Sequence, residues 1–135
     1  MELLTNPKAE YLLGESLELL HAESREWLSE IDFCSEEMSC YYKLLHKNVP
    51  ILGFPTKELA EMEKKMISIS SEELTKVKSR VERHERELAA LMKVTSSTEE
   101  YEYRHQHRVL VNDMYALRGS IRKFKEALFA LVKAS

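Results

Sequence analysis

Residues that make turns are scarce in this chain. Its 135 residues include only 3 Gly and 3 Pro, whereas globular proteins average about 7% Gly and about 5% Pro. β-Sandwiches and β-barrels need many tight turns, so the shortage argues against both. The glycines Gly14, Gly53 and Gly119 stand alone, so the sequence has no glycine-rich loop of the kind that binds phosphate groups. We therefore expect long elements joined by few turns.

Long apolar runs and closely paired cysteines are also missing. No stretch approaches the roughly 18 apolar residues of a membrane-spanning helix, and no basic segment precedes an apolar run at the start. Cys34 and Cys40 are six residues apart in one helical pattern, which places them on different faces. We expect a soluble, cytoplasmic protein with reduced thiols and no membrane contact.

Charge of one sign does not dominate, because the formal net charge is only -3. Residues 1–55 carry 4 basic and 10 acidic side chains, whereas residues 98–135 carry 7 and 5. Nucleic-acid binding needs a basic face that releases many counterions. The densest basic cluster is small and consists of Arg118, Arg122, Lys123 and Lys125. We expect these cations to form ion pairs with acidic residues of the first helix, at the level of Asp32, Glu36 and Glu37, so nucleic acid is not favoured as a partner.

Apolar residues at helical spacing are what the sequence has in abundance. The first seam of such residues predicts a helix over residues 15–47, and its members are Leu17, Leu20, Trp27, Ile31, Cys34, Met38, Tyr41 and Leu45. Pro50 and Pro55 each lack a backbone donor, so we expect this helix to end before residue 48. Residues 1–14 form a leading segment that either extends the helix or makes a short separate one.

A second helix is predicted for residues 56–92, and its apolar spacing changes phase once. The residues alternate by three and four up to Ile69, but the pattern resumes at Leu74, one position later than a regular seam would. Serines concentrate at this point, over Ser68–Ser71. We expect a kink there, or a break that turns three helices into four.

The whole chain, residues 1–135, is predicted to be one all-α domain. A third helix over residues 98–133 keeps a regular alternation of apolar residues nearly to its end. Short loops join the three helices, so successive helices lie side by side and antiparallel. The predicted fold is an up-down-up bundle, slender because each helix is about 50 Å long at about 1.5 Å per residue.

Three histidines from three predicted helices come to one level when the loops are used as hinges. If residue 93 faces residue 98, His84 faces His107, and if residue 47 faces residue 56, His21 lies within about half a turn of His84. Imidazoles that converge in this way suit a divalent metal ion, zinc, iron or manganese. Glu18, three residues before His21, and Glu85, next to His84, would complete the ligand set.

A histidine layer without metal is the other interpretation, and it is the one that we favour. Neutral imidazoles inside a bundle can hydrogen-bond to one another, to Tyr103 or Tyr42, or to water, and so fix the register of the helices. Both interpretations predict loss of stability in acid. Burial lowers the pKa of a histidine, so stability that is present above about 6.5 is lost as the pH falls below that value.

A second apolar strip is expected outside the core. Its candidate members are Leu19, Phe33, Val111, Tyr115 and Phe129. Long bundles often cover such a strip in a dimer, although scattered exposed apolar residues are also normal. We therefore expect a homo-oligomer or a protein partner.

Three groups of residues carry a resemblance to known proteins. They are His21, Ala22 and Glu23, then Trp27, Glu30 and Phe33, and later His84, Glu85 and His107. The chain resembles uncharacterised bacterial helical-bundle proteins of about this length. The resemblance implies a bundle and no activity. No strand-turn-helix elbow or oxyanion loop is visible in the sequence, so a hydrolytic triad is not expected.

The residues therefore favour a small interaction or scaffold bundle without catalytic activity and without cofactor. The alternative is a metal-binding bundle that holds one divalent ion.

Overall fold

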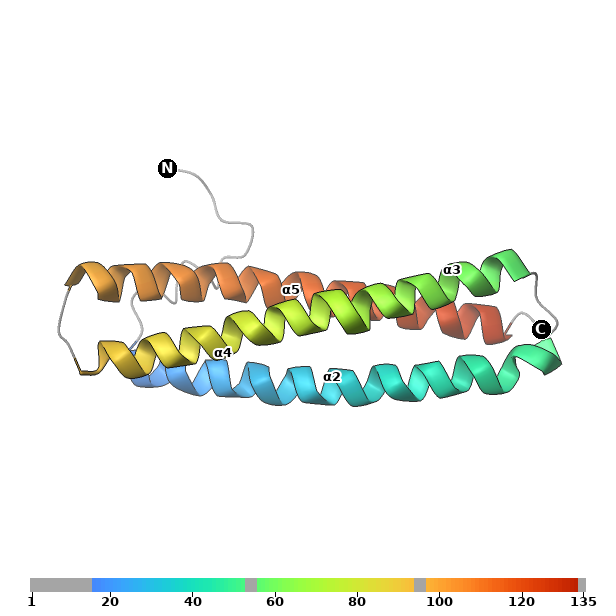
Figure 1. The fold of residues 1–135 in the computed structure, drawn as a ribbon, viewed down its shortest axis with the longest axis horizontal. Helices are drawn as coiled ribbons and strands as arrows, with labels where there is room; N and C mark the ends of the chain where they lie inside the picture. The colour runs from blue at the N-terminus through green and yellow to red at the C-terminus, as the bar shows by residue number, and fades with distance from the viewer. Residues whose placement is uncertain (1–15, 53–55, 94–96, 134–135) are drawn as a thin grey trace.

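The computed structural model describes residues 16–52, 56–93 and 97–133, and within these ranges all regular structure is helical. The elements in chain order are α2 (Leu17–Leu52), α3 (Thr56–Ile67), the π-helical segment η2 (Ser68–Glu73), α4 (Leu74–Leu91) and α5 (Ser97–Lys133). The segments α3, η2 and α4 continue one another as a single rod (Figure 1). The predicted all-α antiparallel up-down-up bundle is confirmed.

The start of α2 is marked by a side-chain cap. Ser16 Oγ accepts a hydrogen bond from the backbone N–H of Leu19 at 3.1 Å, which satisfies one of the amide donors left free at a helix N-terminus. The other end differs from the prediction, because α2 continues through Pro50 to Leu52 instead of ending at residue 47. A proline interrupts one backbone hydrogen bond, and here that loss falls within the last turn, where few such bonds remain to be lost.

The change of phase near Ser68–Ser71 produces neither a break nor a fourth separate rod. Instead the backbone widens into a π-helix, in which the N–H of Leu74 donates to the carbonyl of Ile69, five residues earlier. The wide turn holds one residue more than an α-helical turn. Ile69 and Leu74 are consequently both buried, with 1% and 3% of their surface exposed.

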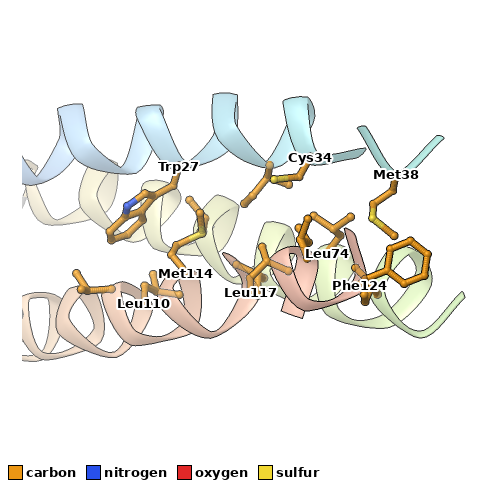
Figure 2. Close-up of a cluster of buried hydrophobic side chains, with 14 of the residues drawn as sticks. Trp27, Cys34, Met38, Leu74, Leu110, Met114, Leu117 and Phe124 are labelled. Carbon is orange, nitrogen blue, oxygen red and sulfur yellow. The ribbon is translucent and has the colours of Figure 1, made fainter. Parts of the chain in front are cut away.

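The core runs the length of the bundle between the three rods. Trp27, Cys34 and Met38 of α2 point toward Leu110, Leu117 and Phe124 of α5 (Figure 2). Trp27 is therefore a core residue, as its place in the seam predicted. Cys34 is buried whereas Cys40 is exposed, and both are free thiols.

None of the helices in the described ranges combines the length and the apolar character that a membrane crossing requires.

Candidate functional site: the histidine layer and the outer face

A buried chain of hydrogen bonds joins the three rods near the start of α2. His84 Nε2 of α4 lies 2.9 Å from His107 Nδ1 of α5, and His107 Nε2 lies 3.0 Å from Glu23 Oε1 of α2. His84 and His107 are 2% and 0% exposed. The predicted encounter of His84 with His107 is thus confirmed.

The positions of the protons follow from the partners. The carboxylate of Glu23 can only accept, so His107 carries its proton on Nε2 and its Nδ1 accepts from the Nε2–H of His84. Burial, reinforced by the neighbouring His107, lowers the pKa of His84 from 6.5 to about 3. His84 is therefore neutral, and its Nδ1 is a buried acceptor without a hydrogen-bond partner among the described residues.

Aromatic rings enclose the two imidazoles. Trp27 stacks on His107 with ring centroids 4.6 Å apart, and Tyr103 stacks on His84 at 4.1 Å with the planes 1° from parallel. Burial and the nearby carboxylate of Glu85 raise the pKa of the Tyr103 hydroxyl. Both imidazoles are almost fully buried, although His84 borders a small pocket of about 250 Å³ together with Glu87 and Gln106.

His21 lies at the same level but in a separate pair. Its Nδ1 is 2.8 Å from Glu85 Oε1, and its side chain is 45% exposed. Glu18 is exposed and lines a small apolar pocket of about 210 Å³ together with His21 and Glu85. Glu85 follows His84 in the chain, so the three imidazoles share one level as predicted, although they do not converge on one point.

The partner of His21 is Glu85 rather than a residue near position 82 because α2 is longer than predicted. Because α2 continues to Leu52, the turn into α3 begins five residues later than it would after a helix that ended at residue 47. Residues of α2 then meet residues of α4 that lie further along the chain. Lys78 lies 3.7 Å from Asp32, a pair that is displaced in the same direction but by seven residues instead of three.

The metal hypothesis receives no support from this arrangement. Within the described ranges no three or more His, Cys, Asp or Glu side chains are grouped so that they could hold a metal ion. His84 and His107 use facing nitrogens on each other, and the second nitrogen of His107 is engaged by Glu23. Glu23 is also the member of the layer that the sequence did not reveal, because an acidic residue one turn from a tryptophan has no distinctive spacing.

The second candidate is an exposed face beside the line along which α2 and α5 pack together. Glu30 of α2 accepts two hydrogen bonds from Arg118 of α5, at 2.6 and 2.9 Å. The core residues Trp27 and Cys34 lie on one side of Glu30 around the helix. Glu26 and Phe33 lie on the other side of Glu30 and therefore face outward. Phe33 is accordingly 63% exposed.

The α5 part of this surface follows a spacing of seven residues, which keeps side chains in one column. The column alternates aromatic and cationic side chains in the order Tyr101, Arg108, Tyr115, Arg122 and Phe129. Tyr115 and Phe129 remain 68% and 46% exposed. Phe129 also contacts Tyr41 of α2 edge to face at 5.9 Å, which places the column beside α2.

We call this surface the outer face, with α5 contributing the column just described and α2 contributing Leu19, Glu26, Phe33 and Cys40. Four of the five residues predicted for the apolar strip are exposed here. The fifth, Val111, was wrongly assigned to the strip. It is 6% exposed because it lies next to Leu110 and three residues before Met114, where the seam of α5 is two residues wide.

The predicted ion pairing of the basic cluster is confirmed for two of its four cations, Arg118 and Lys125. Lys125 lies 3.8 Å from Glu37, as expected for that level, while Arg118 pairs with Glu30. Tyr101, Arg108 and Arg122 were not recognised as part of a surface from the sequence. Their spacing of seven residues is the signal that would have found them.

Comparisons with protein-family models, curated proteins and solved structures give no match. The resemblance to bacterial helical bundles therefore stays a prediction from the residues quoted for it.

Proposed function

We propose that the protein is a small interaction or scaffold bundle without catalytic activity, which works in the cytoplasm by presenting its outer face to a protein surface. The observation that carries the proposal is the column on α5, where aromatic and arginine side chains alternate and where Tyr115, Arg122 and Phe129 are exposed on the same face as Phe33. Aromatic and arginine residues are enriched where proteins bind one another and supply most of the binding energy there. A second copy of this chain is the occupant that the charges fit best.

The histidine layer supports a structural role in this proposal. His84 and His107 are buried, stacked against aromatic rings and bonded to each other. Directional hydrogen bonds between helices specify how the helices align. The layer would then hold α2 and α5 at the relative height that the outer face requires.

The proposal can be tested by photo-cross-linking from single positions in living cells. The photoreactive residue p-benzoylphenylalanine would replace Phe33 or Tyr115 in one pair of variants and Ile67 in a control variant. Ile67 is a matched control because it is 60% exposed but lies on α3. We expect a discrete protein adduct, identified by mass spectrometry of the joined peptides, from positions 33 and 115. Equal labelling from position 67, or no protein adduct from 33 and 115, would overturn the proposal.

A further inference from the structure

We propose that the outer face binds the outer face of a second copy, through a two-fold axis parallel to the helices. In this arrangement α2 of each copy lies against α5 of the other. The inference rests on the proposed function, because it names the partner that the outer face takes. Its support comes from the heights, the charges and the area of the described side chains.

The ion pairs between α2 and α5 set the relative height of the two columns. Glu30 pairs with Arg118, and Glu37 pairs with Lys125, so a residue of α2 is level with the residue of α5 whose number is larger by 88. Phe33 is thus within one residue of the level of Arg122, and Glu26 is within one residue of the level of Tyr115. One residue of helix corresponds to about 1.5 Å.

A two-fold axis parallel to the helices keeps every residue at its own height while it exchanges α2 for α5. The ring of Phe33 then faces the guanidinium of Arg122 in the other copy, a cation–π contact. The carboxylate of Glu26 faces the hydroxyl of Tyr115, which can donate a hydrogen bond to it. Each contact occurs twice, because a two-fold interface uses the same surface in both copies.

The charges of the two helices favour this arrangement over the antiparallel one. The residues of α2 include seven acidic and three basic side chains, whereas those of α5 include five acidic and seven basic ones. A two-fold axis perpendicular to the helices would lay α2 against α2, so that two helices with an excess of acidic residues approach each other. Like charges placed together at an interface are unfavourable and select against that orientation.

The apolar area is sufficient for a weak to moderate dimer. Large aromatic side chains bury about 150–250 Å² each when covered. Four large apolar residues of the outer face lie at levels that the described α2 covers and are about half exposed, namely Leu19, Phe33, Tyr115 and Phe129. Together they offer roughly 400 Å² per copy on that scale, and the stems of Arg108, Arg122 and Glu26 extend the contact toward the roughly 800 Å² per partner of a stable interface.

The first test is the oligomeric state of the full chain by light scattering after size-exclusion chromatography, over a range of concentrations. We expect a concentration-dependent dimer. Phe33→Glu is expected to weaken the dimer at least tenfold, while Ile67→Glu leaves its dissociation constant within twofold. Circular dichroism reports whether each variant keeps its helices. A monomer for the unchanged chain at all concentrations, or equal effects of the two substitutions, would overturn the inference.

The second test fixes the orientation by disulfide cross-linking between copies. Two single variants, Phe33→Cys and Arg122→Cys, are made in a Cys40→Ser background, where the remaining Cys34 is buried. On mild oxidation we expect a cross-linked dimer from the mixture of the two variants and little from either alone. A dimer formed by Phe33→Cys alone would place α2 against α2 and overturn the proposed orientation.

The two proposals fail in different ways. A monomeric chain that still gives a photo-adduct with another protein from positions 33 and 115 would keep the interaction function and remove the second copy as its partner. Loss of adducts from those positions in cells would remove the interaction function, whatever the purified chain does at high concentration.

Discussion

Around His84 and His107 the core is polar, whereas further along the bundle it is formed by Met38, Ile69 and Phe124. The polar level is closed by hydrogen bonds of 2.9 and 3.0 Å that join all three rods. The apolar end leaves a groove of about 800 Å³ between α3 and α5, with Met62 and Phe124 among its lining residues. Apolar contacts are non-directional, whereas hydrogen bonds hold partners to one geometry. We therefore infer that the hydrogen bonds of the polar end fix how the helices align, whereas the apolar end stabilises the bundle through burial.

The largest expected effect concerns the π-helical segment that joins the two ends. Deletion of Ser71 should convert η2 into a regular α-helical turn, because the π-helix holds one extra residue. Both seams then stay in phase, and the free energy of unfolding should change by about 1 kcal/mol or less. Deletion of Ser79, an exposed serine inside α4, should instead rotate several buried side chains out of the core and cost roughly 5 kcal/mol.

Chemical denaturation of the two deletion variants measures this difference. Comparable losses from both deletions would show that the extra residue in η2 is required and not merely accommodated.

A smaller effect is expected from a comparison of two histidine–glutamate pairs, one at each end. His107→Ala should cost about 3 kcal/mol, because it removes the buried ring to which both Glu23 and His84 hydrogen-bond. The coupling energy in a double-mutant cycle of Glu23→Ala and His107→Ala should be about 1.5–3 kcal/mol. His46 and Glu63, 2.9 Å apart and both about 40% exposed, should couple by about 0.5 kcal/mol or less.

Urea denaturation of the four single and two double variants supplies both cycles. Equal coupling energies in the two pairs would contradict the assignment of alignment to the buried layer.

The pH dependence of stability should reflect the polar end of the core, where His84 lies. The pKa of His84 is about 3 in the folded protein and near 6.5 in the unfolded chain, so its contribution is fully present above pH 6.5 and declines as the pH falls toward 3. The expected slope is about 1 kcal/mol per pH unit over that range. The carboxylate of Glu85 and the hydroxyl of Tyr103 lie near the ring and remain in place in the variants.

Thermal denaturation at several pH values measures the slope. His84→Leu should reduce it. A slope that survives His84→Leu would assign the acid sensitivity to other groups.

The smallest expected effect tests whether the polar level is complete without metal. Incubation with EDTA should leave the melting temperature unchanged, because the facing nitrogens of His84 and His107 are bonded to each other. Elemental analysis of protein purified without a histidine tag provides the direct measurement. Bound zinc, iron or manganese in that sample, lost from a His84→Ala/His107→Ala variant, would restore the metal hypothesis.

Periodicity predicted the fold well because burial alone decides which side of a long helix faces inward. The contact of His84 with His107 could be predicted because the loop between α4 and α5 is short and therefore fixes which residues of the two helices are level. The position of His21 was less accurate, since α2 continues through Pro50 to Leu52 and the turn into α3 comes later than the prolines predicted. Side-chain partners such as Glu23 depend on rotamers across the groove, which spacing along one helix does not specify. Val111 was misplaced for a related reason, because the width of a seam depends on how closely the neighbouring rod approaches.

The described chain forms three rods, an odd number, so its first and last rods run in the same direction. The described part enters at the start of α2 and leaves at the end of α5, at opposite ends of the long axis (Figure 1). By the offset of 88 between α2 and α5, Lys133 is level with Leu45, 29 residues from Ser16, so attachments at Ser16 and Lys133 would be held roughly 45 Å apart along the axis. The described bundle therefore sets both the separation and the direction of anything joined at those two points.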